Sequence, residues 1–302
     1  MTTAIDVRGL HKAFGDHHVL DGIDLQVESG TIFALLGANG AGKTTLINIL
    51  STLVKADAGT ATVGGADVTT TPDAVRGLIG LTGQSAAVDE VLTGDENLRM
   101  MGRLFGLSRR DARIRSQQLL EQLGLGDAAR KRAKSYSGGM RRRLDLAISL
   151  IVTPPVVFLD EPTTGLDVRS RRELWGSIRS LRQAGTTVFL TTQYLEEADE
   201  LADRIGVLRD GRIVADGTPA ELKAQTGGEV VQLRGDGDAI LRELPTDGSL
   251  SGLRRAIDQL DAEFSGGEVV LRKPSLDDVF LALTAPTGHN LTDELLPTTE
   301  RS

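Results

Sequence analysis

Alternating hydrophobic and polar positions near the beginning of the chain predict strands at residues 4–10 and 23–27. An uninterrupted apolar run, Ile32–Leu36, predicts a strand that is buried on both faces. A glycine-rich segment comes next, and apolar residues then recur with helical spacing from Leu46 to Leu53. The order of strand, glycine loop and helix predicts an α/β fold for this part of the chain.

Further along, the pattern alternates between helices and short apolar strands. Helical spacing predicts helices at residues 97–107 and 111–125, with Ser108 as a candidate N-cap of one of them. Short apolar runs predict strands at residues 156–159, 187–191 and 205–208. Asp210-Gly211 predicts a hairpin turn into a strand at residues 212–215.

Gly227-Gly228 breaks this pattern and predicts a domain boundary, with a small α+β domain at residues 227–284. Within it the pattern predicts a strand, two helices, a strand and a helix, at residues 229–233, 239–244, 250–264, 268–272 and 275–284. The last helix has an apolar face formed by Leu276, Val279, Phe280 and Leu283. We expect that face to pack within its own domain, with a partner protein as the alternative. Residues 285–302 are expected to form a mobile tail.

The length of 302 residues is consistent with about two domains, since a domain usually has roughly 100–200 residues. A net charge of −8 argues against a general nucleic-acid binder, and the absence of cysteine excludes disulfides and a cysteine nucleophile. No apolar run approaches the ~18 residues of a membrane span, and the first residues lack the pattern of a secretory signal.

The first candidate site is the glycine-rich segment, because residues 37–44 match G-x-x-x-x-G-K-[ST]. Backbone N–H groups of such a loop can surround a polyphosphate, and the start of the following helix favours negative charge. Lys43 can reach the β- and γ-phosphates, and the Thr44 hydroxyl can ligate Mg²⁺. A tight turn before a helix is the alternative, which the flanking strand and helix disfavour.

Two acidic residues, Asp160 and Glu161, end the apolar run Val156–Leu159. Beside a phosphate loop, Asp160 is placed to hold Mg²⁺, and Glu161 to orient or deprotonate the attacking water. The alternative is an ordinary polar strand end.

A third candidate element, Ser137-Gly138-Gly139, opens a helix just before that strand. Its hydroxyl, its glycine backbone and the helix start can form a second anion site, with a plain N-cap as the alternative. A basic cluster surrounds it, made of Lys131, Arg132, Lys134, Arg141, Arg142 and Arg143. Attraction of phosphate or anionic lipid is one interpretation of this cluster. We favour the other, a solvated helix face with local ion pairs.

The ordered motifs resemble the nucleotide-binding subunit of an ATP-binding cassette (ABC) transporter over residues 4–222. Gly37–Thr45 matches the Walker A loop, Val156–Glu161 the Walker B strand and Tyr136–Met140 the LSGGQ signature, whose outer residues differ here. The resemblance implies a P-loop ATPase domain with a mixed sheet over residues 1–226 and a helical subdomain at about 85–153. The implied nucleotide-binding residues are Phe14, Gly37, Ala38, Asn39, Gly40, Ala41, Gly42, Lys43, Thr44, Thr45, Ser137, Gly138, Gly139 and Asp167.

The resemblance also assigns three further elements. Gln84 matches the Q-loop, where it contacts the metal and the water, and Thr164–Asp167 matches the D-loop. Phe14 occupies the place of an adenine-stacking aromatic, with a core position as the alternative.

Gln193 stands where the family usually has the switch histidine. Glutamine can donate a hydrogen bond to a γ-phosphate but cannot titrate as imidazole does, so slow or altered hydrolysis is possible. A solvated position at a helix start is the alternative. The implied catalytic set is Glu161, Gln84, Gln193 and Lys43, and the implied Mg²⁺ ligands are Thr44, Gln84 and Asp160.

Gln193, the signature and the ending PSLDDVFLALT together resemble the daunorubicin-resistance-type subgroup of drug and lipid exporters. This implies an ATP- and Mg²⁺-dependent hydrolase that dimerises on binding ATP and drives a separate permease from the cytoplasmic face of the membrane. The cargo is expected to be a hydrophobic drug, antibiotic or lipid, with no nucleic-acid partner.

The alternative is a non-transport ABC ATPase acting on ribosomes or DNA. Those classes usually carry two cassettes or a long coiled-coil insertion, and this sequence has neither. A P-loop kinase or GTPase is disfavoured, because the Ser-Gly-Gly element is present and the Asn-Lys-x-Asp guanine motif is absent.

Overall fold

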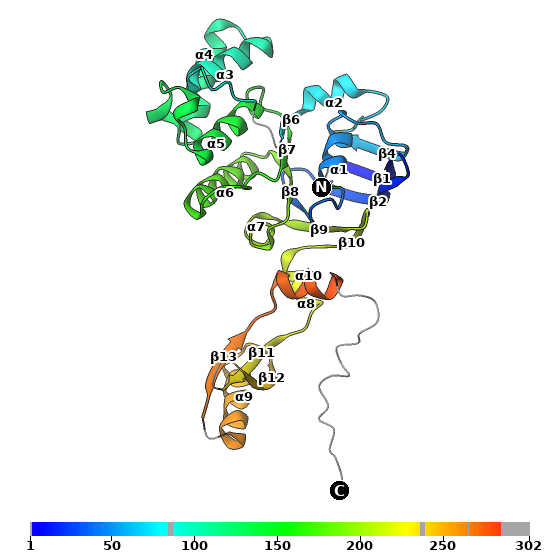
Figure 1. Cartoon of the computed structure of the whole chain (residues 1–302), viewed down its shortest axis with the longest axis vertical. Helices are drawn as coiled ribbons and strands as arrows, with labels where there is room; N and C mark the ends of the chain where they lie inside the picture. Colours follow the sequence, from blue (N-terminus) through cyan, green and yellow to red (C-terminus); the bar gives the residue numbers. More distant parts are fainter. Residues whose placement is uncertain (1, 84–86, 236–238, 265, 285–302) are drawn as a thin grey trace. The chain divides into compact units, whose positions relative to one another are not determined.

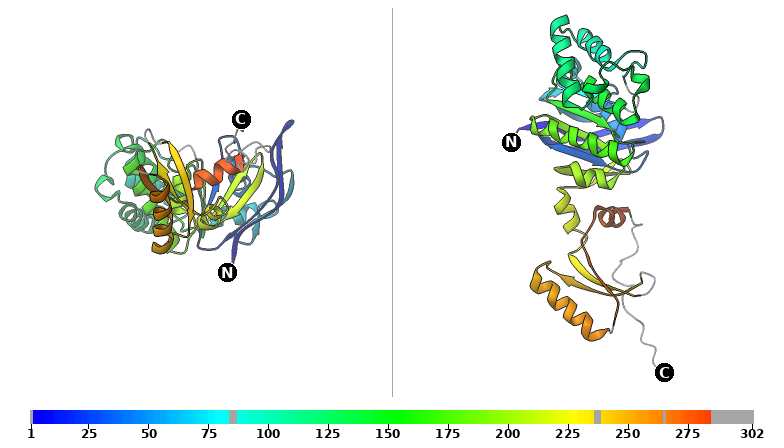
Figure 2. Two further views of the ribbon diagram at one scale, coloured as in Figure 1. Left: turned by 90° about the horizontal axis from the view of Figure 1, so that it is seen from below. Right: turned by 90° about the vertical axis from the view of Figure 1, so that its left-hand side faces the viewer.

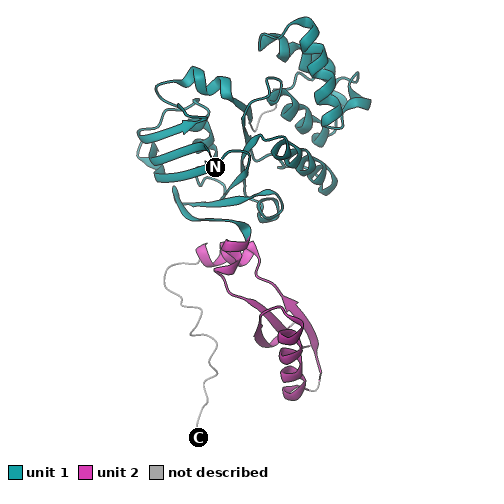
Figure 3. Cartoon of the chain, turned by 180° about the vertical axis from the view of Figure 1, so that it is seen from behind, with its two compact units in different colours: residues 1–219 teal, residues 220–302 magenta. Residues whose placement is uncertain are grey.

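The computed structural model describes residues 2–83, 87–235, 239–264 and 266–284. The chain divides into two compact units, Met1–Pro219 and Ala220–Ser302 (Figure 3). The division falls seven residues before the boundary that the sequence pattern predicts, so most of α8 (Pro219–Ala224) belongs to the second unit. No helix in the described ranges combines the length and apolar character that crossing a bilayer requires.

An antiparallel sheet of order β2-β1-β4-β5 forms one layer of the first unit. Its strands are β1 (Thr3–Phe14), β2 (His17–Glu28), β4 (Ala58–Val63) and β5 (Ala66–Asp67). In β2 the buried residues Ile23, Leu25 and Val27 alternate with exposed positions, as expected for a sheet with one face in the core.

The second sheet of this unit is mixed and has the order β10-β9-β3-β8-β7-β6. Its strands are β3 (Ile32–Leu36), β6 (Ile79–Thr82), β7 (Val156–Asp160), β8 (Thr187–Thr192), β9 (Arg204–Arg209) and β10 (Arg212–Gly217). Neighbours from β9 to β6 are parallel, and β10 returns antiparallel through a turn with both Asp210 and Gly211 at positive φ. β3, β7 and β8 are buried throughout, which confirms the prediction from their apolar runs.

Helices cover both faces of the mixed sheet (Figures 1 and 2). The helices of this unit are α1 (Lys43–Leu50), α2 (Pro72–Leu78), α3 (Gly94–Leu104), α4 (Arg109–Gln122), α5 (Gly138–Ser149), α6 (Val168–Gln183) and α7 (Leu195–Leu201), with 3-10 turns at Gly126–Ala128 and Ala133–Ser135. α1 packs between the two sheets, and Leu46 and Ile49 lie in a core that both sheets share. Helices α3, α4 and α5 lie on the opposite side of β6 and β7, and the candidate cap Ser108 is the N-cap of α4.

The second unit contains a three-stranded antiparallel sheet with β11 (Glu229–Arg234) between β12 (Ile240–Thr246) and β13 (Glu268–Arg272). Helix α9 (Leu250–Glu263) packs on this sheet and buries Ala256 and Leu260 against Val231 and Leu233. The helix predicted at residues 239–244 is wrong, because this segment pairs with β11 along its length. The ladder outweighs local helical spacing. In α10 (Leu276–Thr284), Leu276 and Val279 are buried within the chain, as the prediction of intramolecular packing requires.

Candidate functional site

The loop between β3 and α1 has a backbone that only glycine can supply at three positions. A Cβ at residue 37 would lie 2.6 Å from the Leu208 carbonyl oxygen. Gly40 and Gly42 have φ values of 82° and 107°, which side chains rarely adopt. Gly42 is the N-cap of α1 and offers no side chain to cap the first turn, so the helix start suits an anionic ligand.

The ammonium group of Lys43 lies inside this loop. The residue is only 4% exposed, and Nζ donates to the carbonyl oxygens of Gly37 at 2.8 Å and Ala38 at 3.0 Å. Nζ also lies 3.2 Å from Oε1 of Glu161, at the end of β7. The lysine of the glycine loop and the predicted base therefore form a buried ion pair.

Thr44 and Asp160 meet across the site, although 116 positions separate them in the chain. Oγ1 of Thr44 donates to Oδ2 of Asp160 at 3.0 Å, and Oγ1 of Thr191 donates to Oδ1 at 2.6 Å. Hydroxyl and carboxylate oxygens are the hard ligands that Mg²⁺ prefers. Among the described residues, no group of three or more histidine, cysteine or acidic side chains is arranged to hold a metal ion by itself. The pair thus fits a Mg²⁺ that takes its other ligands from water and phosphate.

Glu161 is held in a left-handed backbone conformation, with φ at 47°. Its N–H donates to the Thr191 backbone oxygen and hydroxyl, at 3.2 and 3.0 Å. Its carboxylate accepts from Thr164 Oγ1 at 3.3 Å, in addition to the Lys43 ion pair. The structure therefore brings together Lys43, Thr44, Asp160 and Glu161, all singled out by the sequence.

The Ser-Gly-Gly element begins α5, and Ser137 is its N-cap, with Oγ accepting from Met140 N at 3.2 Å. Ser137 and Gly138 are exposed, whereas Gly139 is buried against α6. A Cβ at residue 139 would lie 2.5 Å from Ser170 Oγ. The glycine is therefore required for packing, while the serine and the first glycine remain open to a ligand.

Asp167 is exposed and caps α6 by accepting from the Ser170 N–H at 2.9 Å and from its hydroxyl at 2.8 Å. These two hydrogen bonds hold the pKa of Asp167 below its usual range. Because Ser170 also contacts Gly139, the signature segment and the predicted D-loop form one packed corner.

Tyr136 replaces the leucine of the usual signature and has a packing role. Its ring is buried and its hydroxyl donates to the Ala128 carbonyl oxygen at 2.7 Å.

Arg142 is the residue that the sequence interpretation missed. The basic cluster was expected to be a solvated helix face, and Lys131, Arg132 and Lys134 are indeed exposed. The Arg142 side chain, in contrast, is 13% exposed, and its guanidinium donates to backbone carbonyls at the end of β7. Burial lowers the pKa of Arg142, while the charges of nearby carboxylates raise it.

The remaining predicted residues are Phe14, Gln193 and Gln84. Phe14 is 53% exposed at the end of β1, with Lys12 Nζ 5.2 Å from the ring centroid, which contradicts the core alternative. Gln193 is half-buried and directly follows β8, the strand that carries Thr191. Gln84 lies outside the described residues.

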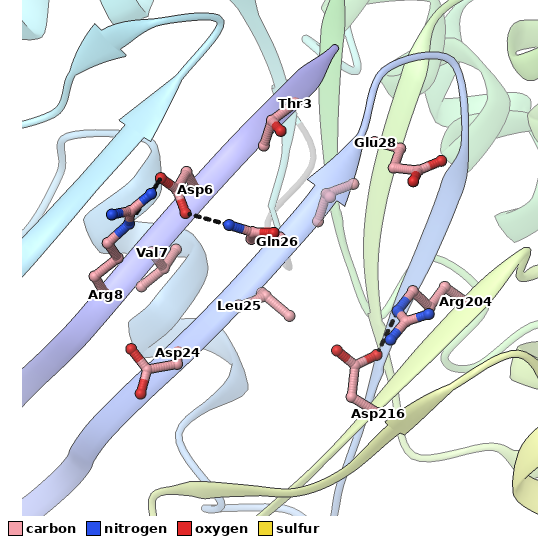
Figure 4. A pocket seen from close by; sticks show the side chains of 11 residues that line it. Thr3, Asp6, Val7, Arg8, Asp24, Leu25, Gln26, Glu28, Arg204 and Asp216 are labelled. Atoms are coloured by element: carbon pink, nitrogen blue, oxygen red, sulfur yellow. Dashed lines mark hydrogen bonds and ion pairs between the residues drawn. The ribbon is translucent and has the colours of Figure 1, made fainter. Parts of the chain in front are cut away.

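A separate polar hollow of about 650 Å³ lies between β1 and β2 on one side and β9 and β10 on the other (Figure 4). Its two arginines are paired within the protein: Arg8 with Asp6 at 2.9 Å, and Arg204 with Asp216 at 2.8 Å. None of the predicted site residues lines it.

Comparison with known proteins gives consistent results. A family model described as ABC transporter matches residues 20–164. A daunorubicin resistance ATP-binding protein of Streptomyces coeruleorubidus is 52% identical, over 93% of this chain and 96% of its own length. A doxorubicin resistance ATP-binding protein of Mycobacterium tuberculosis is 44% identical over 96% of both chains. The structure of CbiO1 from Clostridium perfringens, part of an ABC transporter complex, has a TM-score of 0.70 at 24% identity. It covers 74% of this chain and 92% of that one.

Proposed function

Because the chain belongs to the ABC transporter family as an ATP-binding subunit, we propose that it hydrolyses ATP to power export through a separate membrane permease. The cargo is a hydrophobic drug, antibiotic or lipid, a class supported by the drug-resistance names of its relatives. The proposed ATP hydrolysis rests on one observation. Lys43 and Thr44, at the start of α1, contact Glu161 and Asp160 at the end of β7.

ATP binds with its phosphates on the Gly37–Thr45 loop, where backbone N–H groups and the Lys43 ammonium neutralise them. Lys43 already lies within the loop, so it needs only to exchange its carbonyl and Glu161 partners for phosphate oxygens. Phe14, which is exposed at the end of β1, stacks on the adenine. Thr44 and Asp160 would hold Mg²⁺, with Gln84 as a further ligand, and the metal would supply charge neutralisation for the phosphates.

Glu161 is the general base for the attacking water. A carboxylate at this place suits the role because Lys43 and Thr164 hold it, and because phosphoryl transfer depends mainly on positioning and charge. Gln193 donates a hydrogen bond to the γ-phosphate, and Gln84 contacts the water. The side chain at 193 cannot take up a proton, so the proton goes to Glu161.

Two copies bind two ATP molecules between them. Each ATP lies between the glycine loop of one copy and the Ser137–Gly139 helix start of the other, with Asp167 at the same interface. The exposure of Ser137, Gly138 and Asp167 supports this arrangement. ATP thus satisfies donors from both copies, and hydrolysis removes the shared anion and releases the dimer. The dimer acts at the cytoplasmic face of the membrane, attached through the permease.

Export is tested in cells that express the chain together with its membrane permease, identified beforehand by co-purification with the chain from membranes. Wild-type cells are expected to accumulate less daunorubicin than cells carrying Glu161→Gln in the same pair. Equal accumulation in the two strains would contradict drug export, and ATP hydrolysis by the purified chain would still test the ATPase separately.

A further inference from the structure

The guanidinium group of Arg142 is shared among four backbone carbonyls from two separate segments. Nε donates to Pro162 O at 2.9 Å, and Nη2 to Asp160 O at 2.8 Å and Glu161 O at 3.2 Å. Nη1 donates to Gly83 O at 2.7 Å. A planar group with five N–H donors in a fixed arrangement is well suited to this task, and a lysine is not.

The three carbonyls at residues 160–162 can converge on one group because the chain turns sharply after β7. Glu161 makes that turn with φ at 47°, a conformation that is strained for any residue with a Cβ. A strained backbone persists only where its surroundings hold it. Here the Thr191 contacts hold the N–H side of Glu161, and Arg142 holds the carbonyl side.

Asp145 lies one helical turn after Arg142 and extends the same attachment. Its carboxylate is buried, lies 3.6 Å from Arg142 Nη1 and accepts from Ala87 N at 2.9 Å. Helix α5 therefore holds Gly83 through Arg142 and Ala87 through Asp145, the described residues on either side of 84–86. One helix, which begins at the signature, is bonded both to the end of β7 and to the chain that follows β6.

We propose that Arg142 is a positioning residue for ATP hydrolysis, which fixes the Glu161 backbone and thereby the direction of its carboxylate. Arg142 connects Glu161 to the helix whose first residues contact the nucleotide held by the second copy. The inference rests on the proposed function, because it takes Glu161 as the base. Arg142 acts only through the backbone of its neighbours and does not touch ATP.

The test compares Arg142→Gln with Arg141→Gln in the full-length chain. Arg141 is the matched control, since it is the preceding residue of α5 and its ion pair with Glu90 lies at the surface. We expect Arg142→Gln to lower kcat for ATP hydrolysis about 10- to 100-fold, the scale of a small misplacement of a catalytic group. The Kd for ATP should stay within about twofold of wild type, as positioning requires no change in binding. Arg141→Gln should match wild type in both quantities.

Two further measurements separate positioning from general loss of structure. Arg142→Lys keeps the buried charge but can donate hydrogen bonds to fewer carbonyl oxygens. Its kcat should therefore lie between those of wild type and Arg142→Gln. In the Glu161→Gln background, measured by single-turnover hydrolysis, Arg142→Gln should cause little further loss, because the group it positions is already gone.

A kcat for Arg142→Gln equal to that of Arg141→Gln would overturn the inference. So would a full additive loss in the Glu161→Gln background, or a wild-type kcat for Arg142→Lys if the glutamine variant does not fold. A wild-type chain that does not hydrolyse ATP would instead contradict the proposed function.

Discussion

Nζ of Lys43 lies 3.2 Å from Oε1 of Glu161, so the proposed phosphate-binding cation and the proposed general base form an ion pair in this structure. Both side chains are largely buried, at 4% and 13% exposure. A buried charge that loses its partner is costly, so removing either residue affects the other. In the proposed mechanism, ATP gives Lys43 a competing anion and leaves Glu161 able to accept a proton.

Lys43→Ala is expected to weaken ATP binding about 10- to 100-fold, because charge-assisted hydrogen bonds contribute roughly 1.5–3 kcal/mol. Equilibrium binding of a fluorescent ATP analogue, competed with ATP, measures this change. Lys131→Ala, at an exposed position, is the control and should bind as wild type does. Unchanged affinity in Lys43→Ala would refute the assignment of the phosphate loop.

Glu161→Gln is expected to lower ATP hydrolysis about 10²- to 10⁴-fold, the usual contribution of a general base. Glutamine keeps the shape of the side chain and an acceptor for Thr164, so ATP binding persists and a dimer should accumulate. Phosphate release and the mass of the complex with ATP are the two measurements. Glu196→Gln, an exposed residue of α7, is the control. Undiminished hydrolysis would remove Glu161 as the base.

Gln193→His is expected to hydrolyse ATP at least as fast as wild type, because histidine can also donate to the γ-phosphate. The variant should gain a pH dependence of kcat near the usual histidine pKa of about 6.5, which glutamine cannot provide. Profiles of kcat between pH 5.5 and 8 for both proteins test this. An inactive variant would mean that the site has adapted to glutamine.

Glu197 and Trp175 predict a spectroscopic change with pH. Burial raises the pKa of Glu197, against hydrogen bonds that lower it, including one from Trp175 Nε1 at 3.0 Å. Trp175 is the only tryptophan of the chain, so its emission reports this contact. The emission should titrate above the ordinary glutamate pKa of about 4.3, and Glu197→Gln should abolish the titration.

The raised pKa of Glu197 also determines how the stability of the protein changes with pH. The folded chain binds the Glu197 proton more tightly than the unfolded chain, so the free energy of unfolding falls as pH rises from about 4.3 through the raised pKa. Denaturant unfolding across this range should show less pH dependence in Glu197→Gln. An identical pH dependence in both proteins would show that Glu197 does not titrate there.

Gly139→Ala is expected to destabilise the protein by about 1–3 kcal/mol, because the added methyl group would overlap Ser170. Gly138→Ala is the matched control, since a Cβ there lies 3.6 Å from its nearest neighbour, Leu166. Ser170→Gly should restore most of the loss in the double variant, because it removes both overlapping atoms. Thermal unfolding of the four proteins provides the comparison, and equal stability of the two alanine variants would contradict the packing argument.

The sequence predicts those parts of the fold in which local pattern and tertiary position agree. The strands at residues 32–36, 156–160 and 187–192 are apolar runs because they are buried on both faces, so their pattern is sufficient. Residues 239–244 have no such agreement: the segment is an exposed edge strand whose partner, β11, decides its conformation.

The candidate ATP site is likewise predictable from the sequence only where its residues belong to a local motif. A glycine loop and an acidic strand end have local signatures, so Lys43, Thr44, Asp160 and Glu161 are predictable from the sequence. Three successive arginines do not reveal which one points inward. The available signal is Asp145, a carboxylate within the apolar stretch that follows, one helical turn from Arg142. The left-handed backbone of Glu161 has no sequence signature, because glutamate rarely adopts it.

The contact between Gly139 and Ser170 also limits how chimaeric transporters can be built. The segment that begins α5 and the segment that begins α6 share an interface with no room for a methyl group, and Asp167 fixes the serine in it. Transplanting either loop alone from a relative would bring together two surfaces that were never fitted to each other. The segments that begin α5 and α6 should therefore be exchanged together, as one continuous stretch of sequence that ends after Ser170.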